Sequence, residues 1–178
     1  MKQQLKNQEK IESENIMRHI KIEKVILSCG ATGDNLTKAK KLLDLISQRK
    51  SQIIASNKRI PDFGVRPGLE VGTRVTLRGE EAITLVRRLL GAIDNVLKKK
   101  QISPNHFSFG IHEYIEIPGI EYQRDIGIRG LNVTIVFSRP GIRVANKKRK
   151  SGKLPEKQNV TQPEIIKYME DNFKTKFK

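Results

Sequence analysis

The sequence predicts an α+β domain in which each strand has one covered face and one open face. Segments 71–78 and 131–138 alternate apolar and polar residues with the period of a pleated strand. Other segments repeat apolar residues at the three- and four-residue spacing of a helix. Strands and helices follow one another in an irregular order, which is the pattern of an α+β protein. At 178 residues and 37% hydrophobic composition, one compact domain with tails is expected.

The first third of the chain predicts a tail, a strand and a helix. Residues 1–17 are polar, with little periodicity, and are expected to form an N-terminal tail. The β-branched segment from His19 to Gly30 predicts a strand, with residues 25–27 as its most buried part. A glycine turn follows, and Asp34 is expected to cap a helix that runs through Ser47. This turn lacks both phosphate-loop glycine patterns, and an aspartate at the helix start would repel a phosphate.

The next stretch predicts a basic loop that leads into a two-faced strand. A short strand is expected at Ile53–Ile54, between basic clusters that include Arg49 and Lys50. Four Pro and Gly residues within positions 61–68 are too dense for a regular element. In the following strand, Val71, Thr73, Val75 and Leu77 face one way, whereas Gly72, Arg74, Thr76 and Arg78 face the other. The second face carries two guanidinium groups and a hydroxyl without a carboxylate, so it is either a phosphate-binding face or a solvated surface.

The second half predicts a long helix, an excursion and another strand. Glu80 and Glu81 suit a helix start, and the apolar stripe that follows predicts a helix as far as Lys98–Lys100. The loop-rich stretch from 101 to 130 is expected to be a long excursion with a strand at 111–117. Segment 131–138 then predicts a strand with Asn132, Thr134 and Ser138 on its polar face.

The last 40 residues predict a basic extension that ends in a helix. Residues 139–155 contain seven Lys or Arg residues and no acidic residue. Thr161 and Glu164 form a T-x-x-E capping box, with Val160 and Ile165 placed as a hydrophobic staple. The expected organisation is therefore a tail at 1–17, an α+β domain at 18–138, and an extension with its helix at 139–178.

Composition favours a nucleic acid as the partner. The chain has 35 Lys and Arg residues against 19 Asp and Glu, which gives a formal net charge of +16. Such an excess indicates a polyanionic partner. A membrane is disfavoured because no basic amphipathic helix with Trp or Phe on its apolar face is evident. The single cysteine, Cys29, excludes a disulfide framework and is expected to be a buried, inert thiol.

No catalytic or metal-binding pattern is evident. The three histidines, at positions 19, 106 and 112, have no cysteine or paired carboxylate at metal-ligand spacing. Nucleophile-elbow and zinc-protease motifs are absent from the sequence, and no cofactor is expected. The polar N-terminus lacks a signal peptide, and no apolar run approaches membrane-spanning length, so we expect an intracellular, cytoplasmic protein.

Several motifs together resemble one family of ribosomal proteins. They are FGVRPG at 63–68, VTLRGEEA at 75–82, FSFGIHEYIEIPGIEY at 107–122, DIGIRGLNV at 125–133 and RPGIRV at 139–144. These motifs are similar to those of the universal large-subunit protein five family, whose members bind 5S ribosomal RNA in the central protuberance. The resemblance runs from about residue 17 to residue 173, and the RPG-x-RV segment with its basic tail is similar to the archaeal and eukaryotic branch.

The resemblance implies a fold, partners and site residues. It implies an antiparallel sheet with helices on one face, and an open face that holds 5S rRNA. It implies a loop, Lys58 to Gly68, that reaches peptidyl-site transfer RNA, and an excursion at 101–127 that forms a bridge to the small-subunit head. Large-subunit rRNA and neighbouring central-protuberance proteins are further implied partners, and the ribosome is the implied location. The expected rRNA-binding residues are Arg49, Lys50, Arg74, Thr76, Arg78, Arg143, Lys147, Lys148, Arg149 and Lys150; the expected tRNA contacts are Lys58, Arg59, Phe63 and Arg66.

The sequence departs from the family's motifs at Ser28–Cys29, at residues 30–34, at 47–51 and at 105–106, and two other functions stay open. Ser28 stands where the family has asparagine, and Arg49 lies in a changed S/T-G-Q-x-P stretch, where it could replace a base contact with a phosphate contact. The alternatives are an RNA-processing enzyme, which would need a catalytic constellation, and an extra-ribosomal regulator that binds RNA.

Overall fold

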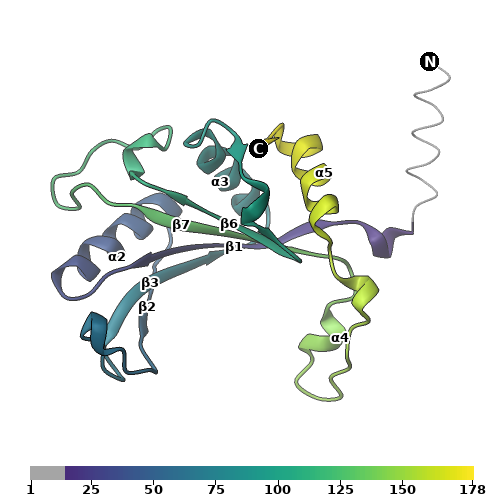
Figure 1. Cartoon of the computed structure of the whole chain (residues 1–178), viewed down its shortest axis with the longest axis horizontal. Helices are drawn as coiled ribbons and strands as arrows, with labels where there is room; N and C mark the ends of the chain where they lie inside the picture. The colour runs from purple at the N-terminus through teal and green to yellow at the C-terminus, as the bar shows by residue number, and fades with distance from the viewer. Residues whose placement is uncertain (1–14) are drawn as a thin grey trace.

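The chain folds as an antiparallel sheet with helices packed on one face (Figure 1). The computed structural model describes residues 15–178. Every pairing within the six-stranded sheet is antiparallel. The strands, in spatial order, are β2 (Gln52–Ala55), β3 (Glu70–Leu77), β1 (Lys21–Gly30), β7 (Leu131–Ser138), β6 (His106–Ile111) and β5 (Ile102–Ser103). The helices on the sheet are α2 (Asp34–Ser47), α3 (Glu80–Gly91) and α5 (Gln162–Phe173). The predicted fold class is confirmed.

Short elements connect and extend this framework. Strands β4 and β8 form a separate parallel pair near the C-terminus. The short elements are η1 (Ile16–Arg18), η2 (Pro61–Phe63), β4 (Val96–Leu97), η3 (Lys99–Gln101), η4 (Tyr114–Glu116), α4 (Arg143–Asn146), η5 (Glu156–Gln158) and β8 (Lys176–Phe177). Most of the predicted tail at 1–17 lies outside the described residues. Within 15–178, no helix is long and apolar enough to cross a bilayer.

Alternation along the strands builds the core. In β3, Thr73, Val75 and Leu77 are buried against the helices, whereas Arg74 is exposed, as the sequence predicts. The prediction for β1 is wrong at one residue: Val25 and Leu27 are fully buried, but Ile26 lies on the opposite face and is partly exposed. Successive strand residues point to opposite faces, so three consecutive residues cannot share one core.

Aromatic side chains connect the middle of the sheet to the C-terminal helix. The Phe107 ring lies 6.0 Å from that of Phe109 and 5.8 Å from that of Phe137, measured between centroids. Phe137 in turn meets Tyr168 of α5 edge-on at 5.6 Å. Ile165 and Met169 of the same helix are fully buried. Helix α5 therefore belongs to the main core, although a basic extension separates it from the sheet in sequence.

The helix predicted as far as Lys98–Lys100 is shorter. Helix α3 ends at Gly91, and Asp94 and Asn95 adopt left-handed backbone conformations with φ of 52° and 57°. Val96 and Leu97 continue the apolar pattern as strand β4, which pairs with β8 about 80 residues later. The apolar pattern does continue beyond Gly91, but there it reflects the burial of a strand and not a further turn of the helix.

The strand in the excursion is also displaced from its predicted place. Strand β6 covers His106–Ile111, whereas residues 114–116 form a 3-10 turn. Phe107, Phe109 and Ile111 are buried, and the residues between them face away from the helices. This alternation is visible in the sequence as FSFGI, and the apolar residues after it favoured the wrong assignment.

Helix starts follow the sequence closely. The expected cap at Asp34 is wrong by one position: Gly33 is the N-cap, and Asp34 is the first residue of α2. The capping box of α5 is confirmed, because the Glu164 carboxylate accepts hydrogen bonds from the Thr161 backbone N–H at 2.9 Å and hydroxyl at 3.0 Å. Val160 and Ile165, the expected staple, are both fully buried.

Candidate nucleic-acid interface

The sheet face opposite the helices carries polar side chains in rows that cross its strands. The register aligns one row through five strands and a second row through four. The first row is Gln52, Arg74, Ser28, Asn132 and Gly110; the second is Thr76, Ile26, Thr134 and Ser108. A third, shorter row is Lys24, Val136 and His106. We call these three rows the open face.

The open face can donate hydrogen bonds and carries positive charge, but none of its twelve positions is a carboxylate. Hydroxyl and amide groups lie at its centre beside the apolar Ile26 and Val136, and the Thr134 and Ser108 hydroxyl oxygens are 3.4 Å apart. Arg74 and Lys24 supply charge near its edges, although the Lys24 ammonium lies 3.9 Å from the Glu23 carboxylate. Hydroxyls and amides bind phosphate oxygens and ribose hydroxyls, and guanidinium groups bind phosphates. The face is therefore suited to the sugar–phosphate backbone of RNA.

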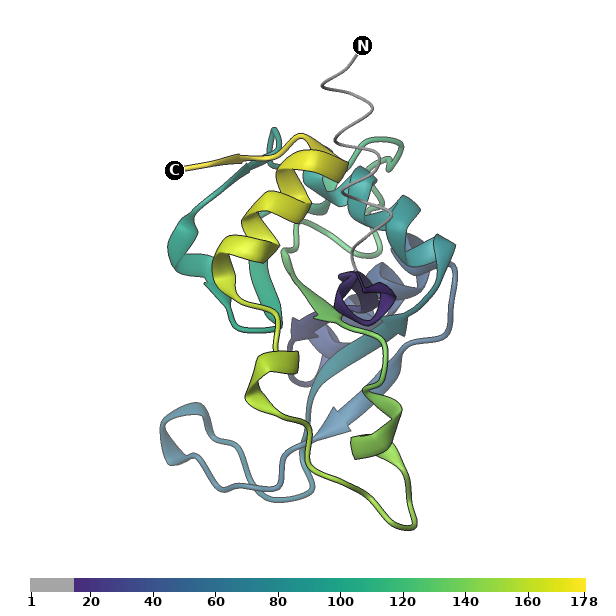
Figure 2. The ribbon, with the colours of Figure 1, turned by 90° about the vertical axis from the view of Figure 1, so that its right-hand side faces the viewer.

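Two segments project from the sheet on the side away from the helices. The first arm is residues 56–69, between β2 and β3, and the second arm is residues 139–158, between β7 and α5. Figures 1 and 2, which differ by a quarter turn, both show the arms extending away from α2, α3 and α5. The open face is thus flanked by two projecting segments that are rich in Lys and Arg.

The first arm presents an aromatic ring at its tip. Backbone hydrogen bonds between Ile60 and Val65, at 2.9 and 3.0 Å, close a small hairpin within the arm. The 3-10 turn η2 and Gly64, whose φ is 62°, form the tip, where a left-handed conformation favours glycine. Phe63 is 80% exposed there. This arm contains the predicted tRNA contacts, all of them exposed: Lys58, Arg59, Phe63 and Arg66.

The second arm carries the densest positive charge. Its short helix α4 includes Arg143, and the exposed residues 147–150 follow directly. At its base, the Gln158 side chain donates to the Pro140 carbonyl at 2.7 Å. Arg139, whose side chain is only 10% exposed, donates to the Glu164 carboxylate at 2.6 Å and to the Lys157 carbonyl at 3.2 Å. These bonds fix the direction in which the arm leaves the domain.

Glu164 makes the anchoring of the second arm sensitive to acid. Burial of its carboxyl opposes ionisation, but hydrogen bonds from Thr161 and the charge of Arg139 outweigh it, and the pKa of Glu164 is lowered from 4.5. A lowered folded-state pKa contributes stability that is fully present above the unfolded value. That stability is lost as the pH falls through the lower folded value.

Glu164→Gln is therefore expected to destabilise the protein by about 1 kcal/mol at neutral pH, the usual weight of a helix cap. The difference from the wild type should shrink below pH 4, and urea unfolding at pH 7 and pH 3.5 measures it. The exposed Glu170 of the same helix provides a control, since Glu170→Gln should leave stability unchanged at both pH values. A cost for Glu164→Gln that does not depend on pH would contradict the role of the ionised carboxylate.

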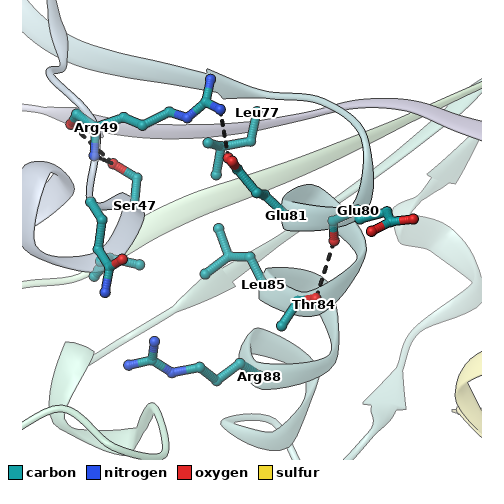
Figure 3. Close-up of a pocket in the computed structure, with 10 residues that line it drawn as sticks. Ser47, Arg49, Leu77, Glu80, Glu81, Thr84, Leu85 and Arg88 are labelled. Carbon is teal, nitrogen blue, oxygen red and sulfur yellow. Dashed lines mark hydrogen bonds and ion pairs between the residues drawn. The ribbon is translucent and has the colours of Figure 1, made fainter.

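The remaining predicted rRNA-binding residues fall into separate places. Arg74 and Thr76 lie on the open face, and Arg78 is exposed immediately after β3. Arg49 instead lies in a hollow between the end of α2 and the start of α3, where its guanidinium is 2.6 Å from the Glu81 carboxylate (Figure 3). The apolar floor of this hollow includes Leu77 and Leu85. Lys50 is exposed one residue further on. The structure does not bring Arg49 and Arg74 together.

Among the described residues, the candidate metal ligands are not grouped and the one cysteine is buried. Within 15–178, no three His, Cys, Asp or Glu side chains are grouped so that they could hold a metal ion. Glu80 and Glu81 begin helix α3, and Glu81 is engaged by Arg49. Cys29 is buried and donates to the Gly130 carbonyl at 3.4 Å; desolvation raises the pKa of its thiol despite the nearby charge of Arg129. The thiol therefore remains protonated and inert at neutral pH.

Sequence reasoning missed most of the uncharged members of the open face. Gln52, Asn132 and Ser108 were not expected at the site, although Asn132 and Thr134 were expected on a polar strand face. Ser28 was noted only as a departure from the family's asparagine. Their common row becomes visible only through the pairing of β2, β3, β1, β7 and β6. Ser138, expected on the same polar face, is instead buried where the chain turns into the second arm.

Comparisons with known proteins show which family the sequence belongs to. A family model described as "Ribosomal protein L5" matches residues 15–66, and one described as "ribosomal L5P family C-terminus" matches residues 70–167. The large ribosomal subunit protein uL5 of Archaeoglobus fulgidus is 35% identical over 94% of this chain and 96% of its own length. The proteins of the same name from Methanosphaera stadtmanae and Sulfolobus acidocaldarius are each 36% identical, over 89% and 90% of this chain and 96% and 92% of theirs. The chain therefore belongs to the ribosomal protein L5 family, on its archaeal and eukaryotic branch.

Proposed function

We propose that this protein binds 5S rRNA through its open face, helps to attach it in the central protuberance, and reaches peptidyl-site tRNA with its first arm. The observation that carries the proposal is the open face itself, three rows without a carboxylate. The salt dependence of 5S rRNA binding by variants of this face tests the proposal, and replacement of Arg74 and Arg78 is expected to flatten it.

Membership of the family gives the coarser function. The chain is a structural protein of the large ribosomal subunit, it is not an enzyme, and it acts in translation on the ribosome, where rRNA is its partner. The net charge of +16 agrees with a polyanionic partner of this kind.

The open face and the second arm support a division of tasks. Uncharged hydrogen-bonding groups dominate the open face, whereas the second arm concentrates charge, including four adjacent cationic residues at 147–150. Charge provides affinity without specificity, and hydrogen bonds together with RNA shape provide the selection. The open face accordingly selects 5S rRNA, and the second arm, with Arg143, holds large-subunit rRNA.

Changing Lys147, Lys148, Arg149 and Lys150 to glutamine is expected to impair incorporation into large subunits and to leave the affinity for isolated 5S rRNA within about twofold. The reason is that four phosphate contacts are removed from an arm that projects beyond the open face. Co-sedimentation with large subunits in high salt measures incorporation, and filter binding measures 5S rRNA affinity. Equal loss in both assays would mean that the arm and the open face hold the same RNA.

Phe63→Ala is expected to reduce contact with peptidyl-site tRNA without affecting the fold. The ring is 80% exposed, so its removal should change the free energy of unfolding by less than about 0.5 kcal/mol. A photoreactive residue at position 63 in assembled ribosomes should crosslink to the tRNA, whereas one at Leu45, on the helical side, should not. Strong tRNA crosslinks from position 45 and none from position 63 would refute the assignment of the arm.

The remaining proposed contacts involve the excursion and Arg49. Residues 101–127 include β5 and β6, which form one edge of the sheet, and the turn η4. We assign to this segment the bridge to a small-subunit head protein. Neighbouring central-protuberance proteins are further partners. Arg49, which is paired with Glu81, would contact RNA only by exchanging that carboxylate for a phosphate. Among the predicted rRNA-binding residues, only Arg49 takes part in an ion pair within 15–178. No other residue of that set would therefore need such an exchange.

Two other functions are tested by simple assays. Time-dependent, saturable cleavage of labelled RNA in magnesium would support an RNA-processing enzyme, although the described residues contain no group of His, Cys, Asp or Glu side chains that could hold a metal ion. An extra-ribosomal regulator would dissociate from large subunits during sedimentation in high salt, whereas a resident protein would remain bound.

A further inference from the structure

Six lysines come together at the C-terminal end of the chain, far from the open face. Parallel pairing of β4 with β8 sets Val96 opposite Lys176 and Leu97 opposite Phe177. Backbone bonds extend the pairing, since the Lys178 N–H donates to the Leu97 carbonyl at 2.9 Å and the Lys99 N–H to the Lys178 carbonyl at 3.0 Å. We call this group the lysine cluster: Lys98, Lys99, Lys100, Lys174, Lys176 and Lys178.

The pleat of the paired strands turns the lysines outward. Leu97 is buried and Phe177 packs against the core, so the alternate positions of both strands face solvent. Lys98, Lys176 and Lys178 occupy these positions, and all six members of the cluster are exposed. Lysines two residues apart on a strand are separated by about 7 Å. The cluster is therefore a set of closely spaced charges held by backbone pairing.

The cluster's charge is not neutralised within the domain. Among residues 15–178, none of the six lysines takes part in an ion pair. The acidic residues adjacent in sequence are Asp94, Glu170 and Asp171, three carboxylates against six ammonium groups. Mutual repulsion makes such a group unfavourable unless it meets a polyanion.

The cluster faces a different direction from both arms. Figures 1 and 2 show the C-terminus on the side of α3 and α5, whereas the arms project from the opposite side of the sheet. One RNA segment lying along the open face would therefore leave the lysine cluster free for a second segment.

The composition of the cluster favours RNA over an acidic protein. Lysine is a flexible point charge that suits phosphates and is depleted at the centre of protein–protein interfaces, which require aromatic and apolar anchors. The neighbouring aromatic rings, Phe173 and Phe177, are engaged by the domain itself: Arg87 lies 6.0 Å above Phe173, and both rings pack against the core. The cluster thus offers charge without an apolar anchor.

We propose that the lysine cluster binds the phosphate backbone of an RNA duplex on the helical side, so that the protein joins two RNA segments held on opposite sides of its sheet. This inference rests on the proposed function for its first RNA, 5S rRNA on the open face. The second contact is independent of base sequence, because ammonium groups that bind phosphates make no contact with the bases.

The test uses the full chain saturated with unlabelled 5S rRNA and a labelled 20-base-pair RNA duplex of arbitrary sequence. Lys98→Gln, Lys176→Gln and Lys178→Gln combined should weaken duplex binding about tenfold at ~0.15 M salt and reduce the magnitude of the log K against log salt slope by about 2. Binding of 5S rRNA should stay within twofold of the wild type. The matched control is Lys38→Gln, Lys41→Gln and Lys167→Gln, which removes the same charge from exposed positions on α2 and α5.

Three results would overturn the proposal. They are an unchanged duplex affinity and slope, an equal loss in the control variant, and tighter binding of a 20-residue polyglutamate peptide than of the duplex, which would indicate an acidic protein. If the wild type failed to bind 5S rRNA, the proposed function would fail separately. The same duplex titration on the protein alone would then still test the lysine cluster.

Discussion

Replacement of both Arg74 and Arg78 by alanine is expected to weaken 5S rRNA binding about 10- to 100-fold at ~0.15 M salt. Arg74 lies in the five-strand row of the open face, next to Ser28 and Gln52, and Arg78 is exposed directly after the same strand. Each phosphate contact adds about 0.7–0.9 to the slope of log K against log salt, so the double variant should flatten this slope by nearly 2. A filter-binding series from about 0.05 to 0.5 M salt measures both quantities.

The control for this series removes two cations from the helical side. Lys38→Ala and Lys167→Ala change the net charge equally and leave the open face intact. This control variant should lose little 5S rRNA affinity, because the two lysines that it removes act on the RNA only through a screened long-range field. Unchanged affinity in the Arg74 and Arg78 variant, or an equal loss in the control, would refute the assignment of 5S rRNA to the open face.

Phe137→Ala is expected to cost about 3–5 kcal/mol of unfolding free energy, as is usual when a fully buried aromatic ring is deleted. Phe137 is 1% exposed and contacts Phe107 of β6 and Tyr168 of α5. Its removal leaves a cavity where the sheet meets the C-terminal helix, and such cavities collapse only partly. Urea unfolding of the wild type and variant, with m-values compared, measures the cost.

Phe63→Ala supplies the contrast for this measurement. It deletes the same ring from a position that is 80% exposed, and so it should shift the urea midpoint only slightly. A cost below about 1 kcal/mol for Phe137→Ala would contradict the view that α5 is integral to the core. A loss of 5S rRNA binding in Phe137→Ala at low temperature, where the variant remains folded, would imply that α5 also positions the open face.

The strands with clear alternation could be predicted from the sequence because their pattern depends on local geometry. Residues 71–77 and 131–137 follow the pleat, and the T-x-x-E box placed the start of α5 correctly. Errors occurred where long-range pairing decided the outcome. Val96 and Leu97 continue a helical stripe in the sequence, but they leave the helix and pair with residues near the C-terminus.

The candidate site could be predicted only in part for the same reason. Charged residues are conspicuous in the sequence, and those of β3 and of the two arms, apart from the half-buried Arg139, are exposed as expected. The hydroxyl and amide groups between them are ordinary strand residues until the register aligns Ser28 with Arg74 and Asn132. Arg49 shows the converse: a cation that is conspicuous in the sequence is paired with Glu81, a partner 32 residues away.

A single measurement tests the central claim, that the open face holds 5S rRNA. The chain's one cysteine, Cys29, is buried, so Ser108→Cys places a unique accessible thiol at the end of the second row of the open face. A crosslinker attached there should join the protein to 5S rRNA in the purified complex, and the same crosslinker at Lys38→Cys, on the exposed side of α2, should not. Crosslinks to 5S rRNA from position 38 and none from position 108 would contradict the account.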